Sequence, residues 1–210
     1  MKLYARPGWG SAIVEYQLAF LGLPFERILV DDLFLAPAAR AQLQPLNPLA
    51  QIPTLLLDDG SVLTESAAIT LWLADLTGTD TLVPVPAAPE RPAFLRWLVF
   101  LVANIYPCFT YADDPARFVP LAAAQQPFRD AVNAHEQQLW RQMDSAAGTP
   151  WFLGEHFSAI DIYLAVMTKW RPGRDWFRAE TPKLFAIATA VEALPQLQSI
   201  IAANHDPLID

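Results

Sequence analysis

The sequence predicts an α+β domain over residues 1–78, followed by a proline-rich linker over 79–91 and an all-α helical bundle domain over 92–210. In the first stretch, two strand-like segments flank a helix-like one, and an Asp-Gly pair then separates two short apolar runs. Asp-Gly between apolar runs is a strong hairpin signal, because such a turn needs a positive φ. Beyond residue 92, by contrast, the segments have the pattern of helices and none has the alternation of a hairpin.

The first domain is expected to begin with a strand–helix–strand unit. Ser11 is a good N-cap for its helix, and Gly22 ends it. A crossover this short implies that the two strands are parallel. A weak helix, the hairpin and a further helix follow, so the order βαβαββα is the thioredoxin-like arrangement. The expected strands are Lys2–Ala5, Phe25–Val30, Thr54–Leu57 and Val62–Thr64, and the expected helices are Ala12–Leu21, Ala36–Leu43 and one that Glu65-Ser66 opens and that runs to Ala74.

The linker contains Pro84, Pro86 and Pro89 with alanines between them, which makes a stiff connection. In the second domain, Ser158 and Asp161 have the spacing of a capping box, and the helix that they begin has almost no polar face. We therefore expect a structural cap and a buried central helix there. The helices expected in this domain are Ala93–Ile105, Pro120–Ala146, Ala159–Trp170, Lys183–Ala193 and Leu197–Ala203.

Composition narrows the possible functions. Hydrophobic residues make up 53% of the 210 residues and charged residues 17%, with a net charge of −8. No basic face is visible, so we expect no nucleic-acid partner. Cys108 is the only cysteine, and the longest apolar run, 98–103, is far short of the ~20 residues that span a membrane. With no secretory signal at the start, we expect a soluble, cytoplasmic protein without membrane association. The three histidines are scattered, so we expect no metal site.

A candidate binding site lies around the hairpin, in the stretch 51–66. Pro53 stands directly before a strand, and an Ile-Pro bond can be cis at modest cost. A cis bond would turn the backbone N–H and C=O of Ile52 away from the sheet, where they could pair with an extended peptide. Ser66 would lie in the first turn of a helix, which favours a carboxylate. A short acidic peptide fits such a site.

The order IPxL, hairpin, then Glu-Ser at a helix start resembles the glutathione-binding half of cytosolic glutathione transferases. The resemblance covers essentially the whole chain and implies the same fold, with glutathione as co-substrate. It implies that Ile52 pairs with the cysteinyl backbone of glutathione beside Pro53, and that Glu65 and Ser66 hold its γ-glutamyl end, with Gln51 beside them. The family also carries the same capping box in its central helix.

The N-terminal run LYARPGWGSAI is most similar to the bacterial beta class, which carries a Tyr and a Cys in this loop. Ala5 and Gly10 stand at those two positions, so both familiar groups are absent. Ser11 is the hydroxyl that remains, and it is either the catalytic group that contacts the sulfur or a plain helix cap. The resemblance places Tyr106 and Phe109 at an apolar co-substrate pocket, although these two residues could equally be core. Trp9 lies in the first loop and is either part of that pocket or an exposed loop aromatic.

The sequence therefore predicts a glutathione transferase that conjugates the thiolate to a small apolar electrophile. A glutathione-dependent isomerase, peroxidase or lyase on the same scaffold is one alternative. A non-catalytic module that binds glutathione or a partner is another, and Ala5 and Gly10 favour it. We also expect a homodimer, because the first long helix is more apolar than one buried stripe requires and because the family is two-fold. The residues behind that expectation are Phe94, Trp97, Leu98, Leu101 and Ile105.

Overall fold

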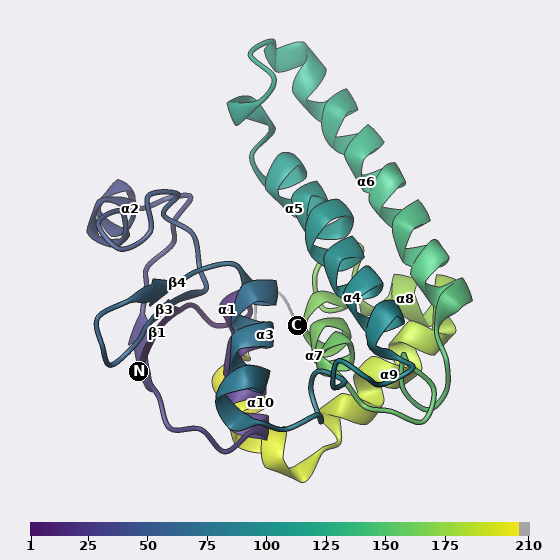
Figure 1. Cartoon of the computed structure of the whole chain (residues 1–210). Helices are drawn as coiled ribbons and strands as arrows, with labels where there is room; N and C mark the ends of the chain where they lie inside the picture. Colours follow the sequence, from purple (N-terminus) through teal and green to yellow (C-terminus); the bar gives the residue numbers. More distant parts are fainter. Residues whose placement is uncertain (206–210) are drawn as a thin grey trace.

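The computed structural model describes residues 1–205, so the last five residues of the expected helical domain, 206–210, lie outside the described part. The N-terminal half is a four-stranded mixed sheet in the order β2-β1-β3-β4 (Figure 1). β1 (Lys2–Ala5) pairs in parallel with β2 (Glu26–Leu29) and antiparallel with β3 (Thr54–Leu56), which pairs antiparallel with β4 (Val62–Leu63). The helices of this half are α1 (Ser11–Phe20), α2 (Pro37–Leu43) and α3 (Ser66–Thr77). The thioredoxin-like arrangement is confirmed.

The sheet and helices of this half share one small core. Leu3 and Ala5 alternate along β1 and point to the same face, as a strand's period of two requires. Val14 and Leu18 are one turn apart on α1, as are Ile69 and Leu73 on α3, so each helix turns one stripe onto the sheet. In the turn between β3 and β4, Gly60 has φ +85°. Glycine adopts such a positive φ readily, and for this reason the Asp-Gly pair predicted the turn.

As far as residue 205, the regular structure of the C-terminal half is helical apart from two isolated bridges near residues 151–156. Figure 1 shows α5 and α6 as a long pair that rises beyond the rest of the molecule. The helices are α4 (Arg91–Phe100), a π-helical turn (Leu101–Ile105), α5 (Tyr106–Asp113), a 3-10 turn (Pro115–Arg117), α6 (Ala122–Ala146), α7 (Ala159–Met167), α8 (Arg174–Glu180), α9 (Pro182–Glu192), a 3-10 turn (Pro195–Leu197) and α10 (Gln198–Ala203).

Two helical segments differ from the sequence prediction. The first long helix was expected to end at Ile105, yet the chain continues through the π-helical turn into α5. Pro107, which has no N–H to donate, closely follows this π-helical turn. The seven-residue helix α8 was not predicted, because a segment this short has little periodicity to detect.

α7 is the buried centre of the helical half, and every one of its residues is buried. The capping box is present: Asp161 accepts hydrogen bonds from the Ser158 backbone N–H at 2.7 Å and from the Ser158 hydroxyl at 3.3 Å. Its other carboxylate oxygen accepts the Phe152 N–H at 2.7 Å. Burial raises the pKa of Asp161 to about 6, against the lowering effect of these bonds. Asp161 therefore joins the preceding loop to the start of the central helix.

The argument from sequence for a dimer surface on the first long helix is wrong. The five residues behind it are between 0% and 6% exposed within the single chain, so they belong to the core and form no surface for a partner. By length and composition, the segment Arg91–Asp113 could also cross a membrane, and 39% of its most apolar window is buried. The core helix of a soluble protein meets the same criterion, so this property assigns no membrane to the protein.

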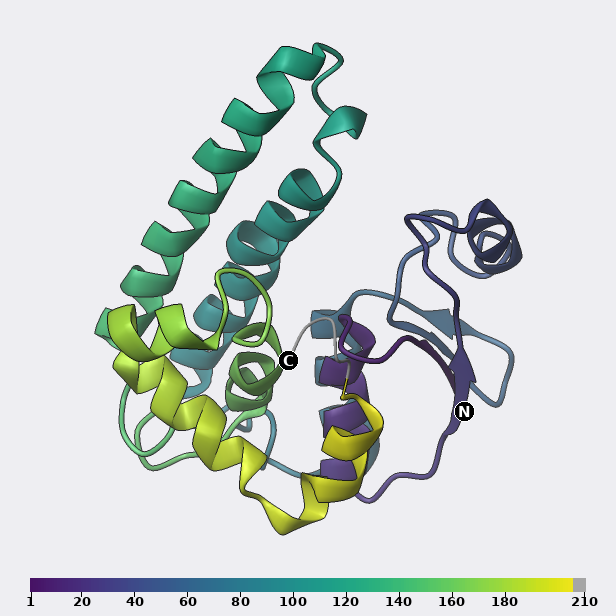
Figure 2. The same ribbon diagram turned by 180° about the vertical axis from the view of Figure 1, so that it is seen from behind.

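The two halves pack on each other extensively. Ala12, Ile13 and Tyr16 of α1 belong to the same buried cluster as α4, α7 and α9. From behind, α10 lies beside α1 (Figure 2), and the two helices are in contact. Helix α10 thus returns to the N-terminal half and meets the helix that follows the first loop.

Candidate functional site

A cleft of about 910 Å³ lies where the two halves meet. The sheet half contributes the loop before α1, the chain around α2 and the start of α3, and the helical half contributes α5 and the segment after α7. The residues that line it are Gly8–Gly10, Leu33, Phe34, Arg40, Asn47, Leu49–Pro53, Thr64–Ala67, Val102, Ala103, Tyr106, Pro107, Phe109–Tyr111, Asp113, Arg117 and Lys169–Gly173.

One end of the cleft gathers the residues expected to bind a peptide. Gln51, Ile52, Pro53, Glu65 and Ser66 all line it, although the hairpin separates them in sequence. The Ile52–Pro53 bond is cis, as expected. Ser66 is the first residue of the twelve-residue helix α3, so free N–H groups and the positive end of the helix dipole face this part of the cleft. The arrangement can hold an extended backbone together with a carboxylate.

Backbone strain marks the same end of the cleft. Ala50 and Glu65 are the non-glycine residues with positive φ in the described chain, at 50° and 63°, and both line the cleft. Such conformations are uncommon for residues with a Cβ, and they tend to cluster at ligand sites. The strain therefore coincides with the proposed peptide-binding residues.

Asn47 is a positioning residue that sequence analysis missed. Its side chain is 4% exposed and donates to the Gln51 carbonyl at 2.9 Å and to the Thr54 hydroxyl at 3.1 Å, while its oxygen accepts the Leu49 N–H at 3.1 Å. These bonds hold both ends of the segment that presents Ile52. The Pro-rich setting of Asn47 predicted only a loop, because Asn commonly bonds to nearby backbone in turns.

A further part of the cleft lining is aromatic. Trp9, Tyr106 and Phe109 all line it, as expected, and Trp170 joins them. The Trp170 ring meets Tyr106 and Phe109 edge-on, with centroids 5.6 and 5.1 Å away. Trp170 escaped the sequence analysis because it lies at the end of a buried helix pattern, where an aromatic residue is usually core. The wall offers apolar area with the geometry that aromatic rings prefer.

Ser11 does not line the cleft. Its side chain is fully buried, donates to the Arg6 carbonyl at 3.1 Å and accepts the Arg6 N–H at 3.0 Å. The structure places the N-cap at Gly10, so Ser11 is the first helical residue and not the cap. Both expected roles of Ser11 are therefore corrected: its hydroxyl closes the loop of residues 6–11 and points away from the place where a substrate would bind.

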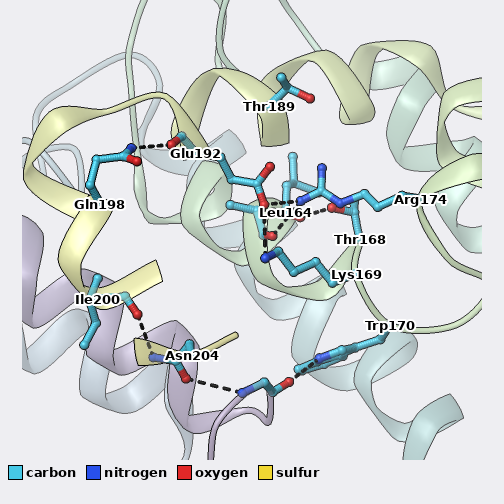
Figure 3. Close-up of polar contacts among 12 residues, drawn as sticks. Leu164, Thr168, Lys169, Trp170, Arg174, Thr189, Glu192, Gln198, Ile200 and Asn204 are labelled. Atoms are coloured by element: carbon cyan, nitrogen blue, oxygen red, sulfur yellow. Dashed lines mark hydrogen bonds and ion pairs between the residues drawn. The ribbon is translucent and has the colours of Figure 1, made fainter. Parts of the chain in front are cut away.

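The same loop is held from the helical half. Trp170 donates its ring N–H to the Gly8 carbonyl at 2.7 Å, and the Asn204 side-chain oxygen accepts the Gly8 N–H at 3.3 Å (Figure 3). Asn204 also donates to the buried carboxylate of Glu15 at 3.0 Å. Arg27 pairs with that carboxylate at 2.9 Å. The loop that begins the cleft is thus fixed by two residues from the far end of the chain.

The position of the single cysteine and of the possible metal ligands bears on the chemistry of the cleft. Cys108 is 4% exposed, lies outside the cleft lining and donates to the Asn104 carbonyl at 3.3 Å. Burial raises the pKa of its thiol to about 11, so it is protonated at neutral pH. Within residues 1–205 no three His, Cys, Asp or Glu side chains are grouped so as to hold a metal ion.

Comparison with known proteins agrees with this geometry. Residues 11–76 match the family model described as glutathione S-transferase, N-terminal domain. The chain is 38% identical over 206 residues to "Uncharacterized GST-like protein YncG" of Escherichia coli, and the match covers 98% of each. The chain belongs to the glutathione S-transferase family. The bacterial, cytosolic type that the N-terminal run indicated is thereby confirmed.

Two solved glutathione S-transferases are similar over nearly the whole chain. A sphingomonad enzyme complexed with glutathione is 28% identical, with a TM-score of 0.77, and the match covers 97% of this chain and 98% of that one. A beta class enzyme of Sphingomonas chungbukensis is 25% identical, with a TM-score of 0.75 and the same coverage. The glutathione S-transferase fold therefore extends through the helical half.

Proposed function

We propose that this protein is a glutathione transferase that joins the glutathione thiolate to a small apolar electrophile. The observation that carries the proposal is the cleft itself. Its strained part brings together Gln51, Ile52, Pro53, Glu65 and Ser66, and aromatic rings line the cleft beside them. A tripeptide held by these residues would direct its cysteine towards the aromatic rings. The similar sphingomonad structure, which contains glutathione, supports this choice of peptide.

In the proposed reaction the thiol first releases its proton to solvent. The sulfur electron pair then forms a bond to an electrophilic carbon, and the leaving group departs with the electrons of the bond that breaks. A thiol with a pKa of about 8.5 must be shifted by about two units, which requires roughly 2.7 kcal/mol of preference for the anion. One charge-assisted hydrogen bond of ~1.5–3 kcal/mol nearly supplies it.

A non-catalytic glutathione-binding module is the second candidate. The observation that favours it is the absence of a Tyr at position 5 and a Cys at position 10, together with the burial of Ser11 away from the cleft. No observation of this kind favours an isomerase, a peroxidase or a lyase over a transferase.

Two measurements separate these candidates. Calorimetric titration with glutathione tests binding independently of any reaction, and a conjugation assay with a general electrophile then tests catalysis. Binding with conjugation above the uncatalysed rate is the expected result. Binding without conjugation would select the module, and no binding at millimolar glutathione would overturn both candidates.

We also propose that the protein is a cytoplasmic homodimer. Its domain limits are those that the sequence predicts, with the first domain over 1–78, the linker over 79–91 and the helical domain over 92–210. Support now comes from the family and from exposed apolar side chains such as Val99 and Leu76, which are 56% and 50% exposed. Two-fold dimers are the commonest oligomers. Sedimentation at micromolar concentration is expected to give twice the 23.3 kDa chain mass, and a single-chain mass would contradict the proposal.

A further inference from the structure

The Tyr106 hydroxyl occupies the space that a side chain at position 10 would need. The backbone of Gly10 is helical, with φ −57° and ψ −21°, so any residue could adopt it. Glycine is required here for steric reasons. A Cβ at this position would overlap the Tyr106 hydroxyl oxygen and lie 3.1 Å from the ring carbon that carries that oxygen. The hydroxyl group from α5 thus reaches across the cleft to the start of α1.

The same point is next to the backbone that would hold the peptide. A Cβ on Gly10 would lie 3.4 Å from the Ile52 carbonyl oxygen. The hydroxyl therefore lies beside both the N-terminal end of α1 and the Ile52 backbone. A ligand cysteine whose backbone paired with Ile52 would carry its sulfur one methylene group away from its own backbone. Such a sulfur would therefore lie near the Tyr106 hydroxyl.

We propose that Tyr106, from the helical half, is the catalytic residue that donates a hydrogen bond to the glutathione thiolate. This inference rests on the proposed function and supplies the activating group that the first loop lacks. Within residues 1–205 no residue is hydrogen-bonded to the Tyr106 hydroxyl, although it lines the cleft, so its proton is available to a ligand. The ring is fixed edge-on against Trp170, whose N–H in turn holds the Gly8 carbonyl.

The electrostatics require Tyr106 to act as a donor and not as a base. Burial raises the pKa of Tyr106 well above its ordinary value, and Tyr163, Glu65 and Asp113 raise it further. The phenol therefore keeps its own proton throughout the neutral range. The proton of the thiol goes to solvent, and the phenol O–H then stabilises the sulfur anion by donating a hydrogen bond to it.

The test is an ultraviolet titration of the bound thiolate in the full-length protein at saturating glutathione. Tyr106→Phe is expected to raise the thiol pKa by about 1–2 units, which leaves about 10- to 100-fold less thiolate at a pH below both values. Glutathione affinity well below the thiol pKa is expected to change less than about twofold, since the thiol form gains little from the bond. Tyr4→Phe on β1, outside the cleft lining, is the matched control and is expected to leave the pKa unchanged.

A second variant tests the position of the hydroxyl by a different route. Gly10→Ala is expected to weaken glutathione binding at least about tenfold, because its methyl group collides with the Tyr106 oxygen. In the Tyr106→Phe background, the same change is expected to weaken binding much less, while the thiol pKa stays raised. Equal losses from Gly10→Ala in both backgrounds would overturn the placement of the hydroxyl.

The inference and the proposed function fail in different ways. A wild-type protein that does not bind glutathione, or whose bound thiol titrates like free glutathione, overturns the proposed function before any variant is made. A wild-type protein with a lowered thiol pKa that Tyr106→Phe leaves unchanged keeps the proposed function and overturns the role of Tyr106.

Discussion

At the scale of single residues, polar side chains around the cleft divide into those that face it and those that build it. Ser66 lies at the start of α3 in the cleft lining, whereas Ser11, which has the same functional group at the start of α1, is turned inward to Arg6. A sequence motif cannot distinguish these two serines, because each is the first residue of a helix and both are buried. Their difference is one of side-chain direction, which only packing decides.

Ser66→Ala is expected to weaken glutathione binding about ten- to hundredfold, the effect of losing one charge-assisted hydrogen bond of ~1.5–3 kcal/mol. The contact to a distant carboxylate is the same before and during reaction, so kcat should change little while KM rises. Steady-state kinetics with varied glutathione measures this split. Ser145→Ala, on the exposed face of α6, is the control, and a fall in kcat alone would contradict the binding role.

Glu136 provides a prediction for the dependence of stability on pH. Its side chain is 1% exposed and accepts the Trp140 ring N–H at 3.1 Å, and burial raises its pKa to about 7 from 4.5. The folded state therefore binds this proton more tightly than the unfolded state. The stability that this proton contributes is fully present below pH 4.5 and is lost as the pH rises through 7.

Chemical denaturation of wild type and Glu136→Gln between pH 4 and 8 measures this effect. Relative to the variant, the wild-type free energy of unfolding is expected to fall by up to about 3 kcal/mol across that range. Taking the difference removes the contribution of Asp161, whose pKa is also raised. A difference that does not vary with pH would contradict a buried, neutral Glu136.

At the scale of elements, the sequence predicted best what is local. The hairpin follows from Asp59-Gly60 and its flanking apolar runs, and the central helix α7 from its capping box, since both signals lie within a few residues. The contact between Tyr106 and Gly10 joins residues that are 96 positions apart, so no local pattern could predict it. The same holds for the dimer argument: a rich apolar composition was observed, but which neighbours bury it depends on tertiary packing.

Removing the cap of α7 is expected to destabilise the whole protein. Asp161→Ala leaves the buried N–H groups of Ser158 and Phe152 without their acceptor, and the expected loss in the free energy of unfolding is about 2–4 kcal/mol. Asp175→Ala provides a matched control, because Asp175 also lies in the first turn of a helix but is 94% exposed and pairs with Arg178 on the same helix. That variant should lose less than about 1 kcal/mol. Equal losses from both variants in thermal denaturation would contradict the role of the buried box.

At the scale of the whole molecule, the two halves are joined beside the cleft by a polar network as well as by the shared core. Glu15 is fully buried, and burial raises its pKa, which Arg27 and the Asn204 amide lower in part. Asn204, 4% exposed, contacts α1 through Glu15, β2 through Arg27 at 3.3 Å and the first loop through Gly8. One amide at the end of α10 thus fixes the position of the loop that begins the cleft (Figure 3).

This network leads to a prediction that couples folding to binding. Asn204→Ala removes a donor from a buried carboxylate and an acceptor from Gly8, so the free energy of unfolding is expected to fall by about 2–3 kcal/mol. The freed loop should also present the cleft less well, and glutathione affinity should fall about three- to tenfold, although Asn204 is not part of the cleft lining. Denaturation and calorimetry on the same samples measure both effects. Asn104→Ala, at an exposed residue whose side-chain amide donates to the Phe100 carbonyl of its own helical segment, is the matched control. A loss of stability with unchanged affinity would show that α10 supports the fold alone, and that Trp170 is sufficient to hold the loop.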